Sequence, residues 1–256
     1  MRELSILKLG GSLITGKGDD GKFREELLRE IGSLLARESR GYLIIVHGAG
    51  SIGHPLAKEY RLDEGYRSPR HLEGFVKTVN AMRVLNSEVV RVLTEAGLFS
   101  IGVPGSLAFQ TRNYSIESVD LSKFIAALDM ELVPVTCGDV VFDRVRKFAI
   151  LSGDSMAVEL ATRLHAKRVI FATDVDGVYK RYGDTSSLIP ELKLGDHLRA
   201  SYAPVDDVTG GMAYKVEVGF EAAKAGAEVL IVNGLHPERI VRALRGERVM
   251  ATRLVT

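Results

Sequence analysis

The chain has 256 residues, of which 46% are apolar and 26% charged, so it is long enough to bury one large core. Its 34 basic residues nearly balance 33 acidic ones, and the formal charge of +1 argues against a broad basic face for nucleic acid. The single cysteine, Cys137, excludes an intramolecular disulfide, and we interpret it as a small residue at a strand end. The sequence shows neither a signal-type apolar region nor a run long enough to span a bilayer. We therefore expect a cytoplasmic protein without a membrane partner.

Short apolar runs alternate with longer amphipathic stretches, the pattern of β-α units over a mainly parallel sheet. In chain order, strands are expected at 5–9, 42–46, 133–136, 168–172, 228–232 and 248–254. Apolar residues three and four positions apart predict helices at about 23–35, 71–95, 121–128, 155–164, 213–225 and 237–244. Two apolar runs around a charged turn predict a hairpin over 138–150.

These elements predict one domain, 1–256, built as a three-layer αβα sandwich with a mainly parallel open sheet. We find no repeat or flexible linker, and place a soft boundary between two lobes near 150–153. Ligands of open α/β sheets bind beyond the carboxyl ends of the strands. The glycine-rich segments of this chain follow those ends.

The first two glycine turns suit an anion. Gly10 and Gly11 follow the first strand beside Lys8, and backbone N–H groups of glycine turns can approach an anion closely. This turn is not a Walker A loop, and taken alone it could equally be a plain strand-to-helix connection. The second turn, 47–55, has three glycines in six residues and suits a nest of N–H donors before a helix. His54, at the end of this loop, can donate a hydrogen bond to a phosphate oxygen.

Three later turns carry charged residues. Asp154 follows Gly153 at a helix start, where it could cap the helix or hold active-site lysines. Asp174 follows a buried strand in a segment that could contact the ribose or base of a nucleotide. Lys215 lies in the first turn of a helix that begins after two glycines, the helix end that disfavours a cation unless an anion neutralises it. Together the turns predict a cationic edge for two phosphate-bearing ligands facing each other.

The set resembles the amino acid kinase family over essentially the whole chain. The motifs that carry the resemblance are KLGGS at 8–12, HGAG at 47–50, SGD at 152–154, TDVDGVY at 173–179 and TGGMAYK at 209–215. Within the family, HGAGSIGHP at 47–55 and KLGGSLITGK at 8–17 most resemble a subgroup that phosphorylates isopentenyl phosphate. The resemblance implies the αβα fold, an ATP-dependent phosphotransferase of isoprenoid biosynthesis, and a homodimer.

The same resemblance implies roles for individual residues. The implied ATP contacts are Lys8, Gly10, Gly11, Ser12, Gly50, Asp174, Gly211 and Lys215. The implied acceptor contacts are Ala49, His54 and Gly153. The implied catalytic residues are Lys8, Lys17, Asp154 and Lys215, with Lys17 stabilising the transferring phosphoryl group and Asp154 organising the lysines. The family uses Mg²⁺ on ATP; since we see no carboxylate cluster committed to it, we expect phosphate oxygens and water to hold the ion.

Other interpretations remain open at this point. A kinase of the same fold could act on fosfomycin, a phosphonate, and other members of the family phosphorylate carboxylates, carbamate or UMP. A non-catalytic nucleotide-binding protein is a further alternative, against which the intact Lys8, Lys17, Asp154 and Lys215 argue. For the organic part of the acceptor, the long helix offers Phe75, Val76, Val79 and Met82, although core packing is the better explanation for most of them.

Overall fold

The computed structural model describes residues 3–16, 21–38, 41–181, 183–196 and 211–256. Its main sheet has eight strands in the order β10-β12-β11-β9-β1-β2-β6-β3, in which every neighbouring pair is parallel except β11 with β12. The strands are β1 (Leu4–Leu9), β2 (Tyr42–His47), β3 (Ser100–Gly102), β6 (Val133–Cys137), β9 (Arg168–Thr173), β10 (Glu191–Lys193), β11 (Glu228–Asn233) and β12 (Ala251–Val255). Because β1, β2, β9 and β11 are apolar on both faces, they lie at the centre of the sheet.

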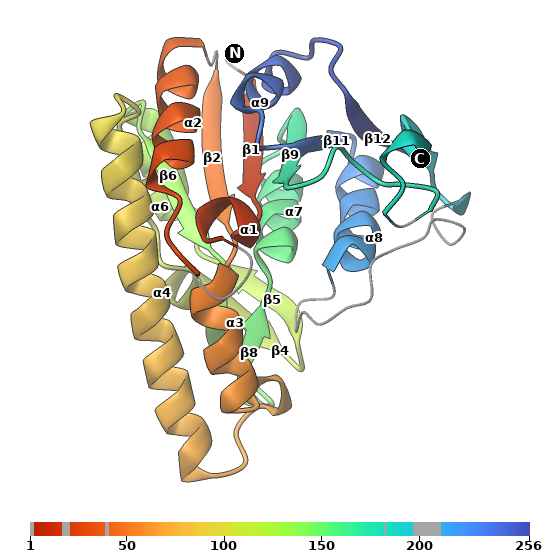
Figure 1. The fold of residues 1–256 in the computed structure, drawn as a ribbon. Coiled ribbons are helices and arrows are strands. Elements are labelled where there is room, and N and C mark those ends of the chain that lie inside the picture. The colour runs from red at the N-terminus through yellow and green to blue at the C-terminus, as the bar shows by residue number, and fades with distance from the viewer. Residues whose placement is uncertain (1–2, 17–20, 39–40, 182, 197–210) are drawn as a thin grey trace.

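Helices cover both faces of this sheet (Figure 1). One face packs against α2 (Glu25–Glu38), α4 (Pro69–Glu95) and α9 (Pro237–Leu244), and the other against α6 (Ser122–Asp129), α7 (Gly153–Arg163) and α8 (Gly211–Lys224). Alternate residues of β1 separate the two cores, since Leu7 belongs to the first and Ile6 to the second. The predicted three-layer αβα sandwich is thus confirmed. Short α1 (Gly11–Ile14) and α5 (Gly105–Ala108) follow strand ends.

A second sheet was not predicted as such. Its order is β5-β4-β7-β8, from β4 (Phe109–Arg112), β5 (Ser115–Val119), β7 (Asp139–Asp143) and β8 (Lys147–Leu151). The hairpin expected over 138–150 forms its β7–β8 half. This sheet packs on α4 and α3 (Gly50–Glu59) through a third apolar cluster that includes Phe148, Ala57 and Val79. It therefore closes the space beyond the carboxyl ends of β1, β2 and β6.

The start of α3 corrects one expectation. The segment 47–55 was expected to be a glycine loop with His54 at its end, but the helix begins at Gly50. His54 consequently lies in the second turn of α3. Thr15 explains the early start, because its Oγ1 accepts a hydrogen bond from the Ser51 N–H at 2.8 Å. The last strand also begins later than expected, at Ala251.

Candidate functional site

Two lysines share one carboxylate at the centre of the molecule. Lys8 is the penultimate residue of β1, and its Nζ lies 2.8 Å from Asp154 Oδ1. Lys215 Nζ lies 2.9 and 2.8 Å from the two Asp154 oxygens. Asp154 stands in the first turn of α7, whereas Lys215 is the fifth residue of α8 and lies in its second turn, one turn later than expected from the sequence. All three side chains are at least nine-tenths buried. The trio carries one negative and two positive charges, so it has a net charge of +1 in a site of low dielectric.

The pKa values follow from that imbalance. Burial alone would raise the pKa of Asp154, but the ammonium groups of Lys215 and Lys8 outweigh it and lower this pKa to about 2. Burial lowers the pKa of Lys215 to about 8, and the cation of Lys8 adds to that effect against the attraction of Asp154. One carboxylate cannot satisfy two buried ammonium groups. The site therefore favours a further anion.

The glycine turns pack backbone against backbone beside the trio. A Cβ at Gly11 would lie 2.6 Å from the Gly50 nitrogen, and one at Gly48 would lie 2.6 Å from the Gly11 nitrogen. Gly50 also has a φ of +53°, a conformation that other residues rarely adopt. Only glycine fits at these contacts, which place the N-terminus of α3 directly beside the start of α1.

Two helix N-termini face the same space. Ser152 caps α7, since its Oγ accepts from the Ser155 N–H at 3.0 Å. Gly153 is the first residue of that helix and packs closely on His47. A Cβ at Gly153 would lie 3.0 Å from the carbonyl oxygen of His47. Helix N-termini carry partial positive charge, so α3 and α7 add to the attraction for anions there.

All of these groups line one cavity of about 980 Å³. The site residues predicted from sequence that it brings together are Lys8, Gly10, Gly11, Ser12, Ala49, Gly50, His54, Gly153, Asp154, Asp174, Gly211 and Lys215. The predicted catalytic Lys17 lies outside the described residues, as do Thr209 and Gly210 of the last glycine turn. The cavity thus gathers widely separated motifs, while the roles assigned to single residues stay predictions.

One end of the cavity is largely apolar. Ala57, Met82, Val140 and Ile150 line it, together with Thr78, whose buried hydroxyl has no hydrogen-bond partner among the described residues. Of the four side chains suggested on the long helix, only Met82 reaches the cavity. Phe75 instead stacks on Phe148 with ring centroids 5.2 Å apart, Val79 is buried in the same cluster, and Val76 is exposed.

The opposite end contains a polar cluster that the sequence did not indicate. Asp176 Oδ1 accepts hydrogen bonds from Asn233 Nδ2 at 3.0 Å and from Arg239 NH1 at 2.5 Å. These contacts hold the turn after β9 against the end of β11 and the start of α9. Asp176 and Asn233 both line the cavity near Asp174.

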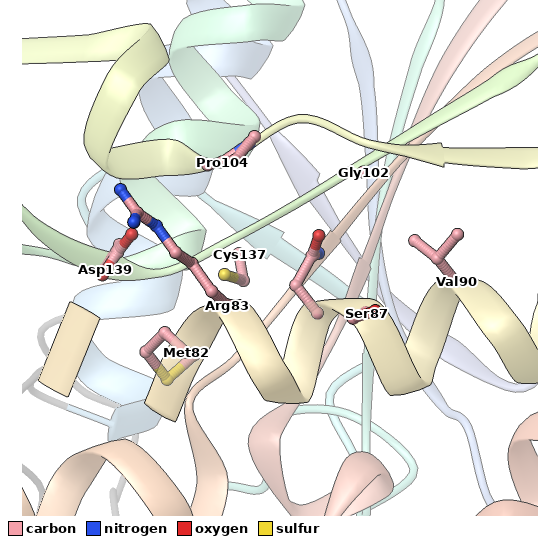
Figure 2. Close-up of a pocket in the computed structure, with 9 residues that line it drawn as sticks. Met82, Arg83, Ser87, Val90, Gly102, Pro104, Cys137 and Asp139 are labelled. Carbon is pink, nitrogen blue, oxygen red and sulfur yellow. The ribbon is translucent and has the colours of Figure 1, made fainter. Parts of the chain in front are cut away.

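A smaller pocket of about 170 Å³ lies behind the cavity, between α4 and β3 (Figure 2). Met82 and Asp139 line both spaces. Figure 2 shows the Arg83 side chain pointing toward Asp139, and burial raises the pKa of that carboxyl to about 6. Burial likewise raises the pKa of the Cys137 thiol. This agrees with the structural interpretation of the cysteine.

Two features of the described residues concern metals and membranes. In that part of the chain, no three His, Cys, Asp or Glu side chains come together as a group able to hold a metal ion. Nor does any described helix combine the length and apolar character needed to cross a bilayer.

The fold and the site define an α/β protein that binds phosphate groups. The features that define it are an open α/β sheet, packed glycine turns, two helix N-termini and a net-cationic trio. Comparison with known proteins narrows the class. A model of the amino acid kinase family matches residues 3–233. The chain belongs to this family.

Individual relatives agree with the family match. An isopentenyl phosphate kinase of Methanothermobacter thermautotrophicus is 38% identical over 260 aligned positions, covering 97% of this chain and 98% of the relative. One from Methanocaldococcus jannaschii is 32% identical and covers 95% and 96%. Among solved structures, an isopentenyl phosphate kinase with 34% identity superposes with a TM-score of 0.83 over 98% of this chain and 99% of its own.

Proposed function

We propose that this chain transfers the γ-phosphoryl group of ATP to isopentenyl phosphate, producing isopentenyl diphosphate for isoprenoid biosynthesis. The observation that carries the proposal is that one cavity holds both kinds of surface. The Lys8–Asp154–Lys215 trio and His54 line it beside its apolar end, which Met82 and Ile150 line. The cationic part suits two phosphates and the apolar end suits a short hydrocarbon. The relatives named above support this acceptor.

The reaction needs charge screening more than a base. A phosphate monoester has a second pKa of roughly 6, so the attacking oxygen is already anionic at neutral pH. The barrier comes from repulsion between two polyanions. Lys8 and Lys215 are proposed to hold the phosphates of ATP. His54, with the Ala49 and Gly153 backbone, is proposed to hold the acceptor phosphate. An oxygen of the acceptor phosphate then attacks the γ-phosphorus in line, and ADP leaves.

Two contributions come from outside the described residues. Lys17 is proposed to stabilise the transferring phosphoryl group and has no structural description here. Mg²⁺ would reduce the charge of the ATP phosphates, and the cavity suits a metal–ATP complex because glycine backbones and a net-cationic trio already form an anion cradle. With no three-ligand group among the described residues, we propose that phosphate oxygens and water hold the ion.

The proposal extends to the organisation of the protein. Residues of about 1–150 would bind the acceptor and those of about 151–256 the nucleotide, since His54 and Met82 lie in the first part and Asp174 and Lys215 in the second. We further propose that the protein is cytoplasmic and forms a homodimer.

A panel of acceptors tests the function. Purified protein is given labelled ATP and Mg²⁺ with isopentenyl phosphate, fosfomycin, UMP, carbamate or N-acetylglutamate, and kcat/KM is measured for each. Isopentenyl phosphate should give the highest value, and ATP should not turn over without an acceptor. The variant His54→Ala should raise the acceptor KM by about 30- to 900-fold with little effect on the KM for ATP, the cost of about 2–4 kcal/mol for one oriented donor.

The panel also separates the alternatives. Preference for fosfomycin would make the protein a phosphonate kinase of the same fold. Binding of ATP without turnover of any acceptor would indicate a non-catalytic nucleotide-binding protein. An unchanged acceptor KM in His54→Ala would remove the role assigned to that histidine.

A further inference from the structure

His47 lies directly behind the glycine turn of the acceptor site and is completely buried. Its Nδ1 is 2.9 Å from the carbonyl oxygen of Gly48. Its own carbonyl oxygen accepts the Gly138 N–H at 3.0 Å and lies against Gly153. His47 therefore stands where the ends of β2, β6 and α7 meet. Burial lowers its pKa to about 4, so the ring is neutral at physiological pH.

Asn86 determines which ring nitrogen carries the proton. Asn86 Nδ2 lies 3.1 Å from His47 Nε2 and 3.4 Å from the carbonyl oxygen of Val135. A flipped amide would bring Asn86 Oδ1 against that carbonyl oxygen, so the nitrogen must face it and the ring. The amide then donates to Nε2, and the neutral ring keeps its proton on Nδ1. The Nδ1–H group donates to the Gly48 carbonyl.

This hydrogen bond fixes the orientation of the next amide. The described peptide bonds are all trans, and in a trans peptide the C=O and N–H point in opposite directions. With the Gly48 carbonyl held against the buried ring, the Ala49 N–H points away from the ring. Ala49 lines the main cavity, and its N–H makes no hydrogen bond within the described part of the chain.

We propose that the buried Asn86–His47 pair positions the Ala49 N–H as a donor to the acceptor phosphate. His47 and Asn86 are positioning residues, since they act through the Gly48–Ala49 peptide. The inference rests on the proposed function for the identity of the ligand, but the ring tautomer and the peptide orientation do not depend on it. If the neutral ring carried its proton on Nε2, two acceptors, Nδ1 and the Gly48 carbonyl oxygen, would face each other. The Gly48–Ala49 peptide would then be free to flip.

Two variants of His47 separate positioning from packing. His47→Asn can place an amide donor near the position of Nδ1, whereas His47→Leu fills a similar volume without a donor. His47→Leu should raise the KM for isopentenyl phosphate about 10- to 100-fold while the KM for ATP changes less than about twofold, as expected for one lost donor to a charged group. His47→Asn should recover most of the acceptor affinity. Equal effects of the two variants would overturn the proposal.

Asn86→Ala should give a smaller rise in acceptor KM, because the ring can then adopt either tautomer. The matched control is Ser87→Ala, which changes the neighbouring lining residue of the same small pocket and should behave as wild type. If the acceptor KM of Asn86→Ala stays at the wild-type value, Asn86 does not set the tautomer.

A measurement on the unmodified protein keeps the proposal testable if a variant fails to fold. Long-range ¹H–¹⁵N correlation on protein labelled at histidine distinguishes the two neutral tautomers without substrate. His47 should show the proton on Nδ1 and should not titrate between pH 6 and pH 8. A proton on Nε2 would overturn the proposal, whereas failure of the proposed function would appear separately, as absence of turnover by the wild-type enzyme.

Discussion

At the scale of single residues, the electrostatics of the site rest on one carboxylate between two lysines. Removing Asp154 would leave two buried ammonium groups without a counter-ion, a loss that typically costs several kcal/mol. Bound ATP would supply the missing negative charge. Bound ATP would also offset the unfavourable position of Lys215, whose cation lies in the second turn of α8, near the positively polarised N-terminus of the helix.

The lowered pKa of Lys215, about 8, predicts a pH dependence of ATP binding. Below this value the lysine is protonated and attracts phosphate, and above it the charge is lost. In the wild-type enzyme, kcat/KM for ATP should therefore fall by about tenfold per pH unit above pH 8. Lys215→Arg should have lower activity but no such fall, because a guanidinium stays charged. Steady-state kinetics from pH 6 to pH 10 checks this.

The effect of Lys215 on protein stability has the opposite pH dependence, which provides a control for that experiment. Lys215 has an unfolded pKa of 10.5 and a lower one when folded, so the unfolded chain binds more protons between these values. Its contribution to stability therefore rises with pH across that window. Thermal unfolding followed over the same range shows whether loss of activity reflects unfolding. An identical fall in Lys215→Arg would assign the titration to another group.

At the scale of elements, Asp143 joins the turns of two hairpins in the second sheet. Its carboxylate accepts hydrogen bonds from the N–H groups of Asn113 and Tyr114 in the β4–β5 turn and of Val145 and Arg146 in the β7–β8 turn. These bonds, with one from Thr111, hold the pKa of Asp143 well below its usual range despite the opposing effect of burial. The sheet that closes the acceptor end thus depends on one buried carboxylate.

Asp143→Ala should destabilise the protein by at least about 1.5–3 kcal/mol, the range for a hydrogen bond to a charged group. The melting temperature should fall by roughly 3–12 °C, measured by circular dichroism. The KM for the acceptor should rise, because Val140 and Ile150 line its pocket, while the KM for ATP should change little. Asp120→Ala is the matched control, since Asp120 is exposed and, within the described residues, its side chain accepts hydrogen bonds from Ser122 alone. Equal melting temperatures in the two variants would contradict this role.

The helices and strands also show which features of the fold could be predicted from the sequence. The central strands and long helices were predictable because burial on both faces and three-four periodicity are local signals. β5 was not, because its residues are exposed or half-buried and form no apolar run. The start of α3 escaped prediction because its capping oxygen comes from Thr15, 36 positions earlier. In the site, the contact of Asp176 with Arg239 could not be predicted, because the two residues are 63 positions apart. The glycine turns could be predicted, because their motifs occur in a recognisable order.

At the scale of the whole molecule, β3 forms one edge of the main sheet, since among the described strands it pairs only with β6. Large apolar side chains are exposed around it, among them Ile101 at 44%, Val84 at 65% and Leu107 at 67%. Each is close along the chain to a residue that lines the smaller pocket. An open edge with exposed apolar groups favours association. We therefore place the proposed homodimer contact here.

Light scattering after size exclusion should give twice the monomer mass for the wild type and the monomer mass for Ile101→Asp, because a buried carboxylate without a partner would break the contact. Val145→Asp is the matched control, since Val145 is also exposed but lies in the β7–β8 turn. The monomeric variant should retain turnover, because Ile101 is not among the residues that line the described cavity. A wild-type monomer would refute the homodimer, and a dimeric Ile101→Asp would move the contact to another face.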